Sequence, residues 1–133
     1  MNHSASAHSE QTHRGTANWI VDPGRRLVCV RFGKKLAFED IGRYAKSLLA
    51  DPSFQPDYSE VVDLTDVEEL DLQADDFLNL ADRIDPFSSE AKRAFVARTS
   101  TQRHAARLHK ALRTQRNIEI FNSVEEAERW LAP

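Results

Sequence analysis

The sequence predicts a single α/β domain built on a mainly parallel sheet. A chain of 133 residues has room for one domain of ordinary size. Its 29% charged and 41% apolar residues are a normal globular balance. Short β-rich runs alternate along the chain with stretches of helical apolar spacing. Such alternation requires right-handed crossover connections, which place successive strands parallel to one another.

The first seventeen residues are predicted to be a disordered tail. They hold no large apolar residue after Met1, so little surface is available to offset the entropy cost of ordering. His3, His8 and His13 are five positions apart, a step of about 140° on a helix, and therefore share no face that could bind a metal. We expect residues 1–17 to form the tail and residues 18–133 the folded domain.

The folded part is predicted to open with a β-hairpin and a helix. Two β-rich runs, 18–22 and 27–33, flank the turn dipeptide Pro23-Gly24, so the first strand should lie antiparallel to the second at a sheet edge. Next comes an amphipathic helix that ends near the prolines at 52 and 56. Its inward stripe is Phe38, Ile41, Ala45, Leu48 and Leu49.

Three more strands and three more helices complete the prediction. The strands are at 60–64, 94–97 and 117–121. The second helix has the stripe Phe77, Leu80, Ala81 and Ile84, and the third covers 101–115 with Ala105, Leu108 and Leu112 inward. A capping box at 123–126 opens the last helix, with Val124, Ala127 and Leu131 inward and Trp130 at the margin. The predicted sheet has five strands, with an antiparallel first edge strand, and four helices surround it.

Several classes of protein are excluded by composition. A formal charge of −3 and a pI of 5.9 exclude a chain that binds nucleic acid by bulk attraction. No apolar run approaches the roughly 18 residues of a membrane span, and residues 1–7 lack the features of a secretory signal. The single cysteine, Cys29, cannot form an internal disulfide and is interpreted as a small buried hydrophobe. We expect a cytoplasmic protein.

Three segments together resemble a known family. GKKLAFED at 33–40, VVDLTDV at 61–67 and VEEAERWL at 124–131 occur in an order and spacing similar to those of SpoIIAA-like, STAS-type proteins, the bacterial relatives of anti-sigma-factor antagonists. The resemblance covers residues 18–132. It implies a βα superhelix and a non-catalytic regulatory or protein-interaction role. CRAL-TRIO lipid-transfer domains share the fold superfamily, which keeps a ligand-binding alternative open.

The chain departs from this family at the regulatory loop. The antagonists carry Asp-Ser-Ser-Gly there and are phosphorylated on the second Ser, whereas this chain has Asp71-Leu72-Gln73-Ala74 with no hydroxyl. The resemblance therefore implies a partner-binding loop and helix start without the usual phosphorylation switch. The corresponding residues are Asp66, Glu68, Glu69, Asp71, Gln73, Asp75 and Asp76.

Charge is strongly segregated along the chain. Residues 57–90 contain twelve carboxylates against one arginine, and residues 91–117 contain eight cations and no carboxylate. Such runs are often only solvated faces, but they also favour an unknown protein partner or a weak homodimer of acidic on basic face. Trp130, a large aromatic at a helix margin, is a candidate contact for the dimer, with packing on the tail or a neighbouring strand as the alternative.

A second candidate site lies where parallel strands end. Asp63 and Asp66 sit at the carboxyl end of one predicted strand, while Thr99, Ser100, Thr101 and Arg103 follow the next strand at a helix N-terminus. They could hold a small anion or other ligand, or one of the hydroxyls could simply cap the helix. A receiver-type aspartyl-phosphate site is excluded because residues 32–35 are cationic where it needs an acidic pair.

Other chemistry is not expected. The sequence has no Gly-rich phosphate loop and no nucleophile elbow, so we expect no enzyme, cofactor or metal. Nucleic-acid binding is not expected either, because no aromatic interrupts the basic stripe of Arg103, Arg107 and Lys110. Five aromatics could line a ligand cavity or simply fill the core: Trp19, Phe32, Phe38, Phe77 and Phe95.

Overall fold

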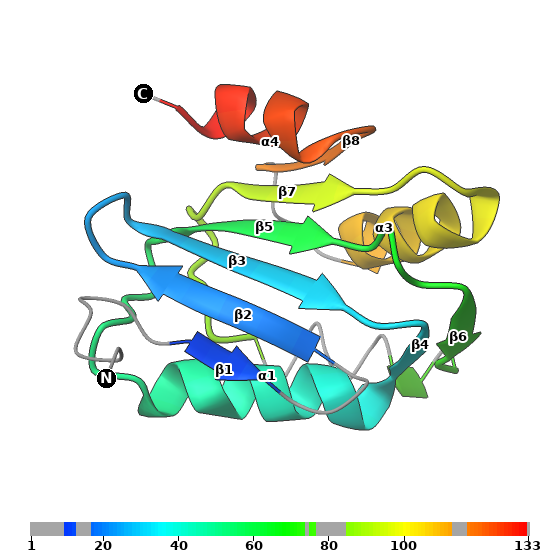
Figure 1. The fold of residues 1–133 in the computed structure, drawn as a ribbon, viewed down its shortest axis with the longest axis horizontal. Coiled ribbons are helices and arrows are strands. Elements are labelled where there is room, and N and C mark those ends of the chain that lie inside the picture. Colours follow the sequence, from blue (N-terminus) through cyan, green and yellow to red (C-terminus); the bar gives the residue numbers. More distant parts are fainter. Residues whose placement is uncertain (1–9, 13–16, 74, 77–84, 113–116, 133) are drawn as a thin grey trace.

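The computed structural model describes residues 10–12, 17–73, 75–76, 85–112 and 117–132. Its main sheet has six strands in the order β1-β2-β3-β5-β7-β8 (Figure 1). These strands are β1 (Glu10–Thr12), β2 (Ala17–Asp22), β3 (Leu27–Phe32), β5 (Ser59–Asp63), β7 (Arg93–Val96) and β8 (Ile118–Phe121). β1 and β3 run antiparallel to β2, and β3, β5, β7 and β8 are mutually parallel. The predicted α/β class with a mostly parallel sheet is confirmed.

Within the described residues, the remaining elements are three helices and a second, smaller sheet. The helices are α1 (Phe38–Ala50), α3 (Ser100–Leu112) and α4 (Val124–Leu131). β4 (Lys35–Ala37) and β6 (Glu69–Asp71) form a separate parallel pair, in which Leu36 is opposite Leu70. No helix in the described part of the chain is long and apolar enough to cross a bilayer.

The strand and helix counts differ from the prediction. The main sheet has six strands instead of five, because β1 lies within the segment predicted as a tail and takes the edge position beside β2. A strand of three polar residues can pair through its main-chain hydrogen bonds alone. The hydropathy of the sequence therefore does not reveal such a strand. Three helices lie in the described part instead of four. The helix predicted from Phe77, Leu80, Ala81 and Ile84 falls outside the described residues.

The hairpin at the start of the domain is confirmed. β2 and β3 pair from Asp22 opposite Leu27 to Ala17 opposite Phe32. In the turn, the Arg26 main-chain N–H donates to the Pro23 carbonyl over 3.2 Å. Arg26 has φ 51°, so a non-glycine residue of this turn adopts the left-handed conformation.

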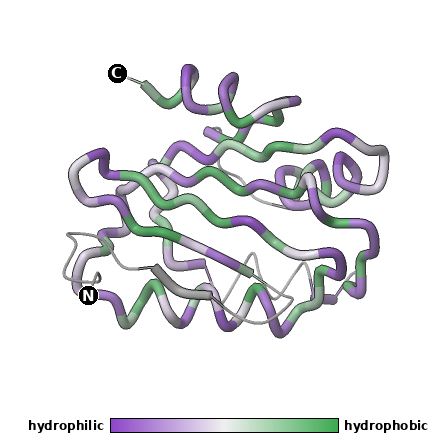
Figure 2. Tube along the Cα trace, viewed as in Figure 1, coloured by the Kyte–Doolittle hydropathy of each residue, from purple (hydrophilic) through white to green (hydrophobic). Residues whose placement is uncertain are grey.

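Hydrophobic residues are frequent along the strands of the main sheet (Figure 2), and the buried ones form two clusters of unequal size. The larger cluster includes Trp19, Val30 and Phe95 and packs against α1 and α3, while a smaller one includes Val61 and the α4 residue Ala127. On α1 the buried stripe passes through Tyr44, Ala45 and Leu48. The prediction that Leu49 faces inward is wrong: 66% of it is exposed, because it lies one residue, or about 100°, beyond Leu48.

The last helix begins as the sequence predicts. The Ser123 hydroxyl accepts a hydrogen bond from the Glu126 main-chain N–H over 3.2 Å. Ala127 is fully buried, and Val124 and Leu131 pack partly buried against the same cluster. Trp130 lies 5.6 Å from the Phe121 ring of β8, with the Lys92 ammonium 5.4 Å from its own ring. Its position at the helix margin is therefore explained by packing on the neighbouring strand.

Candidate functional site

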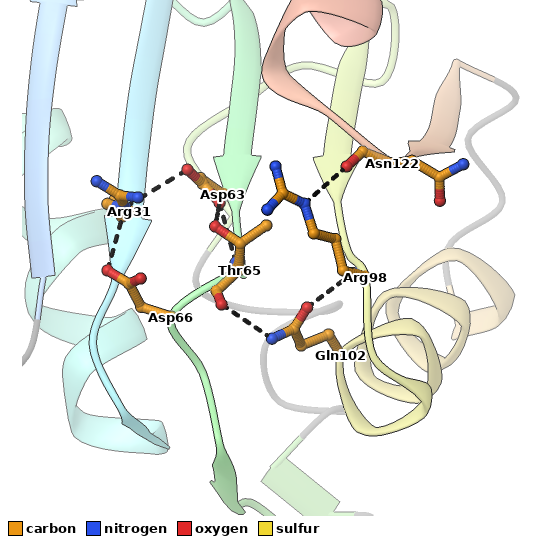
Figure 3. Close-up of polar contacts among 7 residues, drawn as sticks. All are labelled: Arg31, Asp63, Thr65, Asp66, Arg98, Gln102 and Asn122. Atoms are coloured by element: carbon orange, nitrogen blue, oxygen red, sulfur yellow. Dashed lines mark hydrogen bonds and ion pairs between the residues drawn. The ribbon is translucent and has the colours of Figure 1, made fainter.

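Polar side chains meet where the four parallel strands end (Figure 3). Arg31 is near the end of β3 and Asp63 is the last residue of β5. Arg98 follows β7, and Asn122 follows β8 directly. Because parallel strands present their carboxyl ends at one edge of a sheet, residues 91 positions apart in sequence come together here.

Asp63 is held by its neighbours at this edge. Its Oδ1 accepts hydrogen bonds from the Thr65 main-chain N–H, 2.9 Å away, and from the Thr65 hydroxyl, 2.6 Å away. Arg31 Nε lies 3.5 Å from Asp63 Oδ2 and 3.2 Å from Asp66 Oδ2, so one guanidinium pairs with both carboxylates. This places Arg31 in the site, a residue that the sequence reasoning did not single out.

Gln102 joins α3 to the loop after β5. It is only 2% exposed and makes four hydrogen bonds. Its Oε1 accepts from the main-chain N–H groups of Arg98 and Thr99 at 2.7 and 3.2 Å. Its Nε2 donates to the carbonyls of Thr65 and Val67 at 3.2 and 2.9 Å. Sequence reasoning missed Gln102, although the Thr-x-x-Gln spacing at 99–102 is a capping-box signal that could have identified it.

The helix-capping alternative is confirmed for Thr99. Its hydroxyl accepts from the Gln102 main-chain N–H over 3.2 Å, and α3 begins at Ser100. Arg103 donates to the Asn122 side chain, and Arg98 Nε donates to the Asn122 carbonyl over 3.2 Å. Ser100 and Thr101 are exposed. The anion-binding role of Asp63, Thr99, Ser100, Thr101 and Arg103 stays a prediction.

The predicted partner loop is an exposed acidic segment whose main chain is held in place by hydrogen bonds. The N–H groups of Glu68 and Glu69 donate to the Lys34 carbonyl at 2.8 and 3.0 Å. β6 then pairs with β4, and Lys35 Nζ lies 3.6 Å from Asp71 Oδ2. Six residues of this loop are exposed: Asp66, Glu68, Glu69, Asp71, Gln73 and Asp75. Near its end the Gln73 main-chain N–H donates to the half-buried carboxylate of Asp76 over 2.9 Å.

A buried ionic network lies at the opposite end of the same strands. The Tyr44 hydroxyl donates to Glu60 Oε2 over 2.6 Å, and Arg93 Nε donates to Glu60 Oε1 over 2.8 Å. Arg93 also donates from a terminal nitrogen to Asp85 Oδ2 over 2.8 Å. Its guanidinium carbon lies 4.8 Å from the centre of the Phe87 ring. Sequence reasoning did not identify this network, because Glu60 and Arg93 stand 33 positions apart on different strands.

The network shifts two titrations. Burial, with the negative charge of Glu60 as the second cause, raises the pKa of Tyr44 well above its ordinary value. Burial alone would lower the pKa of Arg93, but the carboxylates of Glu60 and Asp85 outweigh it and raise that pKa. Both residues therefore keep their protons at neutral pH, the tyrosine neutral and the arginine charged.

A cavity of about 70 Å³ adjoins this network between the sheet and α1. Apolar side chains line most of it, among them Phe32, Ile41 and Phe95, and the Glu60–Arg93 pair lies at its polar end. Of the five aromatics predicted to line a cavity, Phe32 and Phe95 line this one, whereas Trp19 and Phe38 do not. Phe77 falls outside the described residues. No group of three His, Cys, Asp or Glu side chains able to hold a metal occurs in the described part of the chain.

Comparison with known proteins finds a similar architecture among the solved structures. No family model matches the sequence, and no curated protein matches it. Among solved structures, the chain is similar to an uncharacterized protein of the DUF3478 family with a SpoIIAA-like fold from Shewanella loihica PV-4. The two share 18% sequence identity at a TM-score of 0.56, over 94% of this chain and 92% of the other. Identity this low establishes only the architecture, and the chain therefore has a SpoIIAA-like fold.

Proposed function

We propose that this chain is a non-catalytic regulatory module that binds a protein partner through its acidic loop, residues 66–76. The observation that supports this most directly is the combination of exposed carboxylates with a main chain held by β4 and Lys34. A surface already held in its binding conformation loses less entropy on association than a free loop does. Its negative charge would favour a partner with a basic surface and speed the encounter.

The polar groups at the strand ends support a structural role for that edge. Asp63 accepts both hydrogen bonds of Thr65, and Gln102 uses both its oxygen and its nitrogen within the domain. A general base or nucleophile needs a free side chain aimed at a substrate. In our proposal these residues shape the start of the acidic loop. Because Gln73 stands at the phosphoacceptor position, the binding does not depend on phosphorylation there.

Matched charge reversals test the partner surface. The double variant Glu68→Lys/Glu69→Lys changes exposed carboxylates of the loop, and Glu90→Lys/Glu125→Lys changes two exposed carboxylates elsewhere. Affinity purification from the source cells should recover the same partner with the wild type and the control pair and lose it with the loop pair. Equal recovery by all three proteins would contradict the proposed surface. Hydrolysis of an esterase, phosphatase or nucleotide substrate, abolished by one point mutation, would contradict the non-catalytic assignment.

A small-ligand binder is the second candidate, favoured by the cavity beside Glu60 and Arg93. Its volume of about 70 Å³ exceeds the ~10–15 Å³ that holds one water, so a small apolar molecule is the ligand class to test. A native mass spectrum distinguishes the candidates. A retained small molecule favours the binder, whereas a bare chain of 15.2 kDa leaves the interaction module as the better proposal.

The weak homodimer remains a further proposal about partners. Complementary charge between residues 57–90 and 91–117 is its support, since Trp130 packs within its own domain. Sedimentation at low and high salt should show a dimer that salt weakens. A monomer under both conditions would contradict the dimer.

A further inference from the structure

One face of the main sheet is only partly covered. α1 and α3 pack on one face, while α4, with eight residues, contacts β5, β7 and β8 on the other. On that second face no described helix lies over β2 and β3 (Figure 1). The uncovered strands form one wall of a groove of about 370 Å³, which we call the sheet groove.

The sheet groove has an apolar floor. Ile20 lies opposite Cys29 in the β2–β3 ladder, and Cys29 lies opposite Val61 in the β3–β5 ladder. Val124, in the first turn of α4, completes the apolar lining. Ile20 is 37% exposed, and only one other large hydrophobic residue of the described chain, Leu49 on α1, is also exposed. An apolar strip flanked by polar groups is typical of a surface that a partner covers.

Both ends of the sheet groove carry ion pairs with a surplus of carboxylates. At one end Arg31 pairs with Asp63 and Asp66 at 3.5 and 3.2 Å. At the other end Arg25 pairs with Glu128 at 3.5 Å, and the nearby Asp22 accepts the Arg25 main-chain N–H. Four carboxylates therefore flank the groove against two guanidinium groups. A ligand that contributes positive charge at its ends would balance this surplus.

The width of the uncovered face selects the kind of ligand. Neighbouring strands are about 4.8 Å apart, so β1 to β3 span about 10 Å, which is the diameter of one α-helix. A helix beside α4 would complete the second layer of an α/β sandwich. We propose that the sheet groove binds an amphipathic helix of a partner protein, with apolar side chains over Ile20 and Cys29 and lysines or arginines toward the flanking carboxylates. This surface shares only Asp66 with the acidic loop, at one end, and the proposal does not depend on a partner bound to that loop.

Alkylation of Cys29 can report whether a ligand occupies the groove, because Cys29 is the single cysteine of the chain and lines the groove. The probes are a panel of synthetic 16-residue amphipathic helices with varied apolar faces, each made in a lysine-flanked and a glutamate-flanked version. The readout is the rate of Cys29 alkylation, followed by mass spectrometry on the full chain. We expect at least one lysine-flanked helix to slow alkylation tenfold or more, and its glutamate twin to be at least tenfold weaker.

Two matched variants locate the effect. Ile20→Lys places a cation in the groove, and Leu49→Lys makes the same change at the exposed site on α1. Protection of Cys29 by the lysine-flanked helix should be lost in I20K and retained in L49K. Circular dichroism of both variants checks that each is folded, and amide chemical shifts of Asn18, Ile20 and Val124 should move on peptide addition.

The remaining outcomes overturn the proposal. If the lysine-flanked and glutamate-flanked helices protect Cys29 equally, charge does not select the ligand. If none of the helices protects Cys29 at millimolar concentration, the groove is not a helix-binding site. If alkylation of Cys29 slows as the protein concentration rises without any peptide, a second copy of the chain binds in the groove. Alkylation that accelerates on deletion of residues 1–9 assigns it to the chain's own N-terminal segment.

Discussion

The side-chain nitrogen of Gln102, in the first turn of α3, donates to the main-chain oxygen of Val67 over 2.9 Å, although 35 positions separate the two residues. The same nitrogen donates to Thr65. The start of the acidic loop is thus tied to the helix that follows the next strand of the main sheet. Loss of the hydrogen bond between Gln102 and Val67 should therefore change both the stability of the domain and the conformation of the acidic loop.

Replacing Gln102 should destabilise the domain. Gln102→Leu removes the partner of two carbonyls and two N–H groups, of which the Val67 carbonyl is fully buried, and at about 1–3 kcal/mol for each buried unsatisfied group we expect a loss of about 2 kcal/mol or more. Gln102→Glu retains the acceptor but places a buried carboxylate oxygen against the carbonyls of Thr65 and Val67, so its loss at pH 7 should be at least as large and should shrink at acidic pH, where the protonated side chain can donate. Urea unfolding measures both, with the exposed Thr101→Ala as a control within about 0.5 kcal/mol of wild type. A Q102L protein as stable as T101A would contradict this account.

Removing Arg93 should be more damaging than removing an exposed cation. Arg93→Met leaves the carboxylates of Glu60 and Asp85 buried without their guanidinium, which costs about 3–5 kcal/mol for a buried pair. Lys110→Met breaks an exposed pair with Glu119, where about 1 kcal/mol or less is expected. Thermal or urea unfolding of the two variants compares them directly. Equal losses would show that the buried network contributes no more than a surface pair.

The loss of stability at alkaline pH should depend on the titration of the Tyr44 hydroxyl. Its pKa in the folded protein is raised by burial and by Glu60, so the unfolded chain loses this proton first. The resulting stability is fully present below the unfolded pKa of about 10 and decreases as pH rises from there toward the folded pKa. Tyr44→Phe should lower stability at pH 7 and show a shallower decrease above pH 10. An unchanged slope in the variant would rule out Tyr44 as its source.

The thiol of Cys29 should react slowly. Burial, followed by the charge of Glu128, raises its pKa from 9.0 to about 11. At pH 8 the thiolate fraction is then about a hundredfold lower than in an unperturbed thiol, an effect that greater intrinsic nucleophilicity offsets in part. We expect iodoacetamide to modify the folded chain at least about tenfold more slowly than the urea-unfolded chain. Similar rates in both states would contradict the raised pKa.

Local signals in the sequence predicted most of the fold. The Pro-Gly turn, the stripe through Ala45 and Leu48, and the Ser123 N-cap each depend on residues close together in the chain, and each is confirmed. Strands of three residues, such as β4 and β6, are too short to show a period of two. Because the two strands pair through main-chain groups, no pattern of side chains predicts their pairing.

The candidate sites were less predictable, because their contacts join distant segments. Asp63 and Thr99 were placed at strand ends by topology, but the bond of Asp63 to Thr65 and its pairing with Arg31 require coordinates. Glu60 is an acidic residue inside a strand that the hydropathy pattern reads as buried. Its partners Tyr44 and Arg93 come from a helix and from another strand, at separations that no local pattern can specify.

The order of strands in the main sheet has a consequence for how the chain is made. Every strand from β1 to β8 in that sheet lies beside the one that precedes it there, so the sheet grows at one edge only. A chain emerging from the ribosome at about 5–20 residues per second can add each strand to a neighbour already synthesised, without waiting for its C-terminus. Among the described elements, β8 and α4 are synthesised last and complete the smaller cluster around Val61 and Ala127. Truncation from the C-terminus should therefore remove layers in the reverse order of synthesis.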